Sequence, residues 1–191
     1  LCRAFAGKKP GFEYISSSIG ATGLATLHVG LFKKVIVSYA GESYPTPGPS
    51  KVVQRAIADG LDIENWTMLT ISQRLLGGAM GVPWFPTRSL TGSSIGEEQK
   101  ARGNYMEMDD PSRPGETFGL LKSYRPDISF VHAWAADKAG NAICYPPLFE
   151  SLCVRDAAGS LRPVLRGTPH MGLRIEERHG RIAEIGGTLD D

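Results

Sequence analysis

Apolar positions near the start of the chain follow two different periods, one typical of strands and one of a helix. Residues 12–18 (Phe-Glu-Tyr-Ile-Ser-Ser-Ser) have the aromatic and β-branched character of a short strand, and residues 35–37 (Val-Ile-Val) form a continuous apolar run. Between them, leucines recur at helical spacing from Leu24 to Leu31, behind a cap at Thr22 or Gly23. Because continuous apolar runs are typical of strands covered on both faces, the pattern predicts a strand, helix, strand unit of an open, mostly parallel α/β sheet with helices on both faces.

The next segments continue this alternation with weaker signals. The predicted elements are a helix over 50–60, a short exposed strand over 62–64, a helix over 70–80, and an edge strand or loop over 82–86. Prolines lack the N–H that a central strand must donate, which is why the last segment is restricted to an edge. The apolar face of the first helix is formed by Val52, Val53, Ala56 and Ile57.

The second half of the chain has less regular patterning. Residues 91–117 are rich in Gly, Ser, Pro and charge, which predicts a long flap or a segment that contacts a partner. Residues 128–132 (Ile-Ser-Phe-Val-His) have the pattern of a buried strand, and residues 137–141 have the turn chemistry of a hairpin-like reversal. Residues 173–185 alternate like a two-stranded hairpin.

Composition and charge narrow the class of protein. With 191 residues, 41% of them hydrophobic and 21% charged, the chain is long enough for one buried domain and is not disordered in character. A net charge of +1 gives no electrostatic reason to expect nucleic acid or a membrane as partner. Three cysteines leave one unpaired, which favours a reducing, cytoplasmic location. The first residue is Leu rather than Met, as in a fragment whose natural start is missing.

The loop over residues 38–44 (Ser-Tyr-Ala-Gly-Glu-Ser-Tyr) is the first candidate site. It follows the most apolar predicted strand, and ligands of open α/β sheets lie outside the carboxyl ends of strands. Groups suited to substrate contact belong to Ser38, Tyr39, Gly41, Glu42, Ser43 and Tyr44. A solvated turn explains the same composition equally well. Glu42 is the loop's one carboxylate, but the sequence shows no partner that would orient it as a base or nucleophile, and an exposed glutamate is the commoner case.

A second cluster, residues 87–94, combines one arginine with hydroxyl groups. Arg88 is able to bind a carboxylate in a bidentate manner, although a surface ion pair is the alternative. Other familiar site patterns are missing. The four histidines lack the spacing of metal ligands, which disfavours a metal site, and no G-x-S-x-G elbow occurs. The two glycines Gly20 and Gly23 favour a tight turn over a phosphate-binding loop.

Taken in order, four stretches resemble the A (α) subunit of the family I coenzyme A transferases, nearest to the glutaconate type. They are Gly30–Tyr39 (GLFKKVIVSY), Ile71–Pro83 (ISQRLLGGAMGVP), Phe85–Leu90 (FPTRSL) and Arg125–Ala142 (RPDISFVHAWAADKAGNA). The glycine-rich Gly-Gly-Phe-type segment of the family is absent, and residues 153–191 depart from its pattern. The resemblance implies a transferase-type α/β domain over 1–150 and an unassigned tail or hairpin over 151–191.

The resemblance also implies a function. Family members use a glutamate of the B subunit to attack an acyl-CoA thioester, and CoA then passes through a glutamyl-CoA thioester to an acceptor carboxylate. This chain would therefore carry no catalytic residue, would need a B-type partner, and would bind CoA thioester as substrate without a permanent cofactor. The loop 38–44 would line the acyl or acceptor pocket as a substrate-binding segment. Thr70, Arg88 and Ser89 would contact substrate or support the subunit interface, whereas Arg74 would fix the docking of a helix. A CoA-thioester hydrolase or decarboxylase, or a non-catalytic ligand-binding domain, remains an alternative on this fold.

Overall fold

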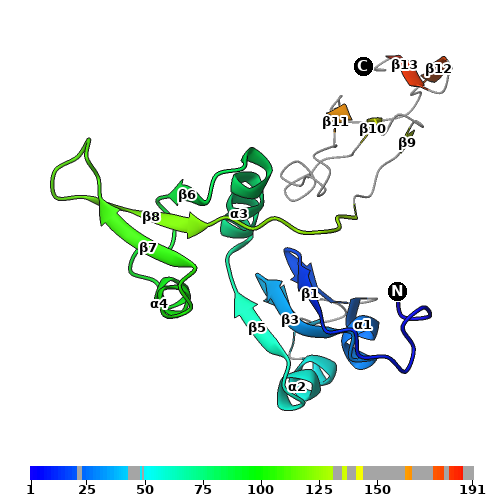
Figure 1. The fold of residues 1–191 in the computed structure, drawn as a ribbon, viewed down its shortest axis with the longest axis horizontal. Coiled ribbons are helices and arrows are strands. Elements are labelled where there is room, and N and C mark those ends of the chain that lie inside the picture. Colours follow the sequence, from blue (N-terminus) through cyan, green and yellow to red (C-terminus); the bar gives the residue numbers. More distant parts are fainter. Residues whose placement is uncertain are drawn as a thin grey trace. The chain divides into compact units, whose positions relative to one another are not determined.

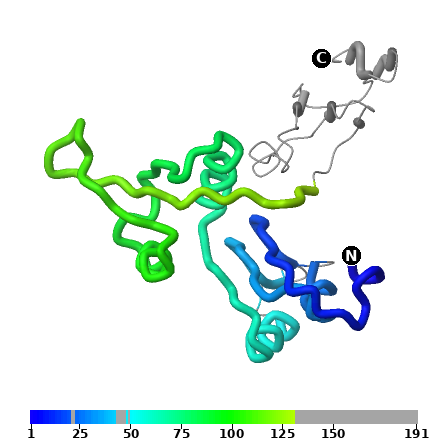
Figure 2. Tube along the Cα trace, in the orientation of Figure 1, coloured from blue at the N-terminus to red at the C-terminus, as the bar shows by residue number. Residues whose placement is uncertain are grey.

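The computed structural model describes residues 1–20, 23–42, 48 and 50–130, and beyond them the backbone of five short strands (Figure 1; Figure 2). The chain divides into two compact units. Unit 1 comprises Leu1–Ser72 and Pro86–Leu121, and unit 2 comprises Gln73–Phe85 and Lys122–Asp191. The domain boundary expected at residue 150 stays a prediction. None of the helices in the described part combines the length and the apolar character that crossing a membrane requires.

A parallel sheet in unit 1 confirms the predicted strand, helix, strand unit. Its strands are β1 (Phe12–Ile15), β3 (Phe32–Val37) and β5 (Asp62–Asn65), paired in the order β1-β3-β5. Both pairings are parallel, and Figure 1 shows the three strands side by side. Helix α1 (Leu24–His28) lies between β1 and β3 in the chain. Strand β2 (Ser18–Ile19) follows β1 and strand β4 (Tyr39–Ala40) follows β3, each after a short break, and β2 pairs with β4 in parallel.

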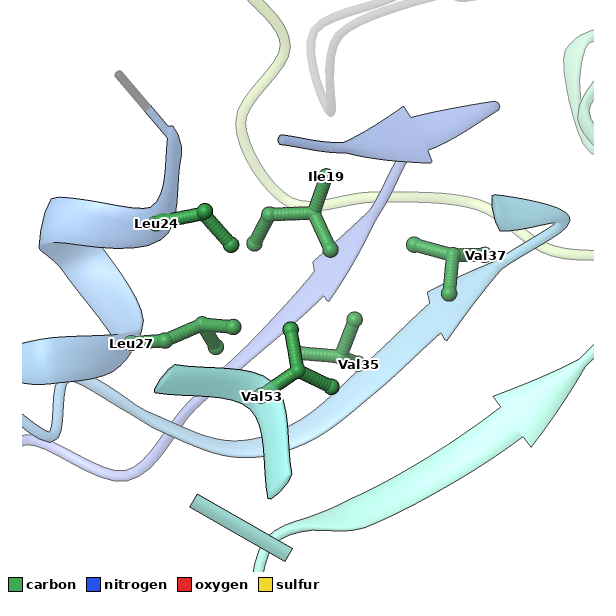
Figure 3. Packing of buried hydrophobic residues seen from close by; sticks show 6 residues of the cluster. All are labelled: Ile19, Leu24, Leu27, Val35, Val37 and Val53. Carbon is green, nitrogen blue, oxygen red and sulfur yellow. The ribbon is translucent and has the colours of Figure 1, made fainter. Parts of the chain in front are cut away.

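One hydrophobic cluster of unit 1 lies on one face of this sheet. Val35 and Val37 alternate along β3 onto that face, where they pack with side chains from α1, from β2 and from α2 (Lys51–Ala58). The six members of the cluster in Figure 3 are Ile19, Leu24, Leu27, Val35, Val37 and Val53. The predicted apolar face of α2 is confirmed for three of its four residues, because Val53 is buried and Val52 and Ala56 pack against the cluster. Ile57, in the last turn of this eight-residue helix, is exposed.

Strand β5 is present where a strand was predicted over 62–64, but the prediction that this strand is exposed is wrong. It pairs with β3 in the register Lys34↔Asp62 and Ile36↔Glu64, and the Glu64 side chain is buried. Alternating acidic residues usually indicate a solvated strand. Here Lys34 forms an ion pair with Glu64, which compensates the carboxylate for its loss of water.

The segment 91–117, predicted to lack regular structure, contains a helix and most of a hairpin. Helix α4 (Ser94–Ala101) begins at Ser93, whose side chain accepts a hydrogen bond from the Gly96 amide at 3.0 Å. Strands β7 (Tyr105–Asp109) and β8 (Thr117–Lys122) pair antiparallel. With β6 (Trp84–Thr87) they form a sheet in the order β6-β8-β7, so the expected edge position of the proline-containing strand is confirmed.

Helix α4 covers the open edge of β5. The Gln99 side chain donates a hydrogen bond to the Asn65 carbonyl at 2.9 Å, and Arg102 donates one to the Ile63 carbonyl at 3.2 Å. Arg102 also forms a bidentate contact with the Asp62 carboxylate, at 3.1 and 3.0 Å. Two side chains thus occupy carbonyl groups that an edge strand would otherwise offer to another chain.

Helix α3 (Met68–Met80) confirms the helix predicted over 70–80. Its Arg74 donates a hydrogen bond to the Lys122 carbonyl at 2.8 Å and accepts one from the Tyr124 amide at 3.0 Å through its own carbonyl. A Cβ at Gly78 would collide with the Tyr124 carbonyl, so glycine is needed where this segment crosses the helix. The expected role of Arg74 in docking a helix is confirmed.

Beyond residue 122 one strand prediction fails and two hairpin predictions hold. Ile128 and Phe130 are exposed and lie outside any strand, because an apolar run without a pairing strand does not become one; residues 131 and 132 lie outside the described part. Strand β10 (Asn141–Ile143) pairs antiparallel with β9 (Ala135–Ala136) and parallel with β11 (Arg162–Val164). Strands β12 (Arg174–Arg178) and β13 (Arg181–Gly186) form the predicted hairpin.

Candidate functional site

The carboxyl ends of the three parallel strands lie at one edge of the unit 1 sheet. Hydrogen bonds continue there past the strands themselves: the Ser16 amide donates to the Ile36 carbonyl at 3.1 Å, and the Trp66 amide donates to the Val37 carbonyl at 2.9 Å. The segments that follow β1, β3 and β5 are therefore brought together at this edge, where open α/β sheets bind their ligands. We call it the carboxyl edge.

Ser38 is held at the carboxyl edge by the backbone of Ser17. The Ser17 carbonyl accepts hydrogen bonds from the Ser38 amide at 3.1 Å, from the Tyr39 amide at 3.2 Å and from the Ser38 hydroxyl at 2.5 Å. Three donors on one carbonyl bend the chain between β3 and β4 and fix the direction in which the loop leaves the sheet. The Ser38 hydroxyl keeps its lone pairs as acceptors for a bound group.

Gly20 and Gly41 bring two backbone segments into close contact at this edge. The Gly41 amide donates to the Ile19 carbonyl at 3.1 Å, and a Cβ built at Gly20 would lie 2.6 Å from the Gly41 carbonyl oxygen. A Cβ at Gly41 would lie 3.1 Å from the Gly48 carbonyl oxygen. The approach at Gly20 leaves no room for a side chain, whereas a Cβ at Gly41 would need its neighbour to shift by a few tenths of an ångström.

Tyr39 and Glu42 complete the described part of the loop. The Tyr39 hydroxyl donates to the Glu42 carbonyl at 2.7 Å, and the Gly48 amide donates to the same carbonyl at 3.2 Å. Both bonds hold the backbone of Glu42 and leave its half-buried carboxylate without an ion pair to any other described residue. The structure thus brings together Ser38, Tyr39, Gly41 and Glu42. Ser43 and Tyr44 lie outside the described residues.

Thr70 takes part in a reciprocal cap at the start of α3. Its hydroxyl accepts a hydrogen bond from the Thr67 amide at 3.1 Å, while the Thr67 hydroxyl accepts one from the Thr70 amide at 3.1 Å. The two hydroxyl oxygens lie 2.8 Å apart, and Thr70 is fully buried. This is the geometry of a capping box, in which two unsatisfied amides at a helix start are bonded reciprocally. The predicted contact of Thr70 with substrate stays a prediction.

We expect the substitution Thr70→Ala to destabilise the protein by about 1 kcal/mol, because the Thr67 amide loses its acceptor. The matched control is Ser50→Ala at the start of α2, since Ser50 has no side-chain bond to its helix. Urea unfolding of both variants measures the difference. Equal losses at the two caps would contradict the assigned role of Thr70.

Arg88 and Ser89 follow β6 rather than the parallel strands. The Arg88 guanidinium forms ion pairs with Asp110, at 3.3 Å, and with Glu116 at the base of the β7–β8 hairpin. The hydrogen bond to Glu116 raises the pKa of Arg88, and hydrogen bonds from Ser112 are the main cause of the lowered pKa of Asp110. The Ser89 amide donates to the Thr87 hydroxyl at 3.1 Å. Arg88 thus forms the surface ion pairs that were the alternative interpretation, and the predicted contact of Arg88 and Ser89 with substrate stays a prediction.

The sequence did not predict one buried charged group, which lies on β5. Glu64 is fully buried, pairs with Lys34 and accepts a hydrogen bond from the Trp66 indole at 2.6 Å. Its signal in the sequence is only an acidic residue within an alternating segment, and nothing local distinguishes it from a solvated one.

Among the residues the structure describes, no group of three or more His, Cys, Asp or Glu is arranged to hold a metal ion.

Comparisons with known proteins agree on one family. The sequence model described as coenzyme A transferase matches residues 9–161. The A subunit of a probable succinyl-CoA:3-ketoacid coenzyme A transferase of Bacillus subtilis is 33% identical over 114 residues, which cover 58% of this chain and 40% of that protein. The human mitochondrial succinyl-CoA:3-ketoacid coenzyme A transferase 2 is 27% identical over 143 residues, 69% of this chain and 26% of that protein.

Solved structures show the same fold. Glutaconate coenzyme A-transferase from Acidaminococcus fermentans superposes with a TM-score of 0.64 at 17% identity, covering 80% of this chain and 51% of that one. A variant of the decarboxylase AibA/AibB superposes with a TM-score of 0.61 at 19% identity, covering 83% of this chain and 58% of that one. The chain thus spans between 26% and 58% of the length of these four proteins.

Proposed function

Because the chain belongs to the coenzyme A transferase family, we propose that it is the A-type subunit of an acyl-CoA:carboxylate CoA-transferase. In this proposal it forms one side of an active site that it shares with a B-type subunit. Several relatives are named as the A subunit of succinyl-CoA:3-ketoacid coenzyme A transferase, and these names support the assignment.

One observation at the carboxyl edge carries the proposal. The Ser38 and Tyr39 hydroxyls donate their hydrogens to the Ser17 and Glu42 carbonyls, so their oxygens are left to accept hydrogen bonds from donors of a substrate, such as the amide groups of a CoA thioester, beside closely approached backbone. Its one carboxylate in the described segments, Glu42, has no ion-pair partner among the described residues to activate it as a nucleophile. The edge is thus suited to binding a thioester, and the attacking carboxylate is expected from the B-type subunit.

The proposed reaction divides one difficult exchange into easier steps. The partner's carboxylate attacks the thioester carbonyl and releases the CoA thiolate, which leaves an acyl–glutamyl anhydride. The thiolate then attacks the glutamyl carbonyl, which frees the original acid and forms the glutamyl-CoA thioester. An acceptor carboxylate reverses these two steps. Acyl-CoA is the substrate, no permanent cofactor is needed, and a cytoplasmic location is part of the same proposal.

The experiment uses the full-length chain purified with its B-type subunit, incubated with succinyl-CoA and acetate and treated with borohydride. We expect exchange of CoA between the acids and a reduced glutamyl group on the partner, with none on this chain. Neither chain alone should be active. Loss of the thioester without exchange and without a trapped intermediate would overturn the transferase and favour the hydrolase or decarboxylase. A pair that neither binds nor consumes acyl-CoA would favour a non-catalytic, ligand-binding domain.

A further inference from the structure

Glu64 is a buried carboxylate that the proposed reaction does not use. Two donors from different segments of unit 1 converge on it, namely the Lys34 ammonium group from β3 and the Trp66 indole N–H, at 2.6 Å. A buried ion pair is commonly no more stabilising than a pair of apolar side chains of the same volume. Stability alone therefore does not account for a charged group at this position.

Trp66 connects Glu64 to the carboxyl edge. It is fully buried and comes immediately after the last residue of β5. Its indole donates a hydrogen bond to the Glu64 carboxylate, while its backbone amide donates one to the Val37 carbonyl at 2.9 Å. Val37 ends β3, and the next residue, Ser38, begins the candidate loop. The Glu64 side chain thus holds the residue whose amide holds the end of β3.

The peptide unit between Val37 and Ser38 is bonded from both sides. Its carbonyl accepts from the Trp66 amide, and its N–H donates to the Ser17 carbonyl at 3.1 Å. These two partners belong to the segments that follow β5 and β1, on either side of β3. A peptide unit is planar, so the two bonds together fix its orientation. That orientation sets the direction in which the loop leaves the sheet.

We propose that Glu64 is a positioning residue for the shared site and acts through Trp66 on the peptide unit between Val37 and Ser38. The inference rests on the proposed function and deepens it. Without an acceptor at position 64 the buried indole N–H is unsatisfied, and the Trp66 side chain moves to find another partner. The amide that holds β3 moves with it, and a displacement near 1 Å at a site lowers activity by as much as roughly 100-fold.

Two double variants separate the hydrogen bond from the charge. Glu64→Gln alone does not, because an amide offers one oxygen to the two donors that the carboxylate serves. In Lys34→Met with Glu64→Gln, the amide oxygen accepts from the indole and no charge is left unpaired. In Lys34→Met with Glu64→Leu, no charge is left unpaired either, but the indole loses its acceptor. The matched control changes the exposed pair in the same way, Lys33→Met with Glu13→Leu.

The first measurement is kcat/KM for CoA exchange between succinyl-CoA and acetate, with each full-length variant in complex with its B-type subunit. We expect the variant with Glu64→Gln to stay within about threefold of the unmodified complex and the variant with Glu64→Leu to fall about tenfold or more. The second is hydrogen exchange of the amides over residues 38–42, which should be faster in the Glu64→Leu variant only. The control should change neither quantity.

The remaining outcomes contradict the inference or decide it by another route. Equal activity and equal hydrogen exchange in the two double variants overturn it, because only the bond to Trp66 distinguishes them. If the unmodified complex exchanges no CoA, the proposed function fails, and the hydrogen exchange still decides whether Glu64 positions the loop. If the Glu64→Leu variant does not fold, Trp66→Phe replaces it, since it removes the donor and keeps the ion pair. Unchanged hydrogen exchange over residues 38–42 in Trp66→Phe would then overturn the inference.

Discussion

Replacing Glu64 with alanine is expected to lower the free energy of unfolding by about 3 kcal/mol. The Glu64 side chain is 1% exposed and the Lys34 side chain 25% exposed, so the substitution leaves a largely buried lysine side chain without its counter-charge. It also removes the acceptor of the buried Trp66 indole N–H, at 2.6 Å. Breaking a buried pair from one side is costly because the remaining charge cannot regain water.

Two further variants isolate the cause. Glu13 pairs with Lys33 at 3.1 Å on an adjacent strand, but these side chains are 38% and 63% exposed, so Glu13→Ala should cost no more than about 0.5 kcal/mol. Replacing both buried partners, Lys34→Met with Glu64→Leu, should recover most of the loss because no charge is left unpaired. Urea denaturation of the full-length protein measures all three. A loss for Glu64→Ala no larger than that for Glu13→Ala would show that the pair contributes nothing through burial.

The substitution Gly20→Ala is expected to have the largest effect on activity. Its methyl group would lie 2.6 Å from the Gly41 carbonyl oxygen, so the backbone of one segment must shift. Overpacking of this kind costs about 1 to 3 kcal/mol, and a displacement near 1 Å at a site lowers activity by as much as roughly 100-fold. Because Gly41 lies within the candidate loop, we expect kcat/KM for acyl-CoA to fall by more than the loss of folded protein at the assay temperature explains.

Gly48→Ala is the control for this prediction. Gly48 belongs to the same region and bonds to Glu42, but a Cβ there would meet no heavy atom of the described residues within 4 Å. The control should keep its activity and its melting temperature when assayed with the B-type subunit. Equal effects of the two substitutions would show that the contact between Gly20 and Gly41 does not shape the site.

Elements that carry a local period were predictable. The leucines of α1, the valines of β3 and the alternation of β12 with β13 each lie within a few residues of one another, and all three elements are present. Helix α4 was missed although its capping residue Ser93 is a recognisable signal, because its Gly and charged residues hid the helical period. The run at Ile128 was overpredicted, because composition alone does not provide a pairing strand.

The sequence by itself determined the parallel strand, helix, strand unit, the polar loop after β3 and the family, because these depend on residues that are neighbours in the chain. Only the tertiary structure decided which charges are satisfied. Arg88 and Glu116 are 28 residues apart, and Lys34 meets Glu64 only through the pairing of β3 with β5. Whether a charged side chain is free to bind substrate depends on which oppositely charged residues the fold places beside it. The loop kept its place at the carboxyl edge, while the cation expected to bind substrate was found already paired.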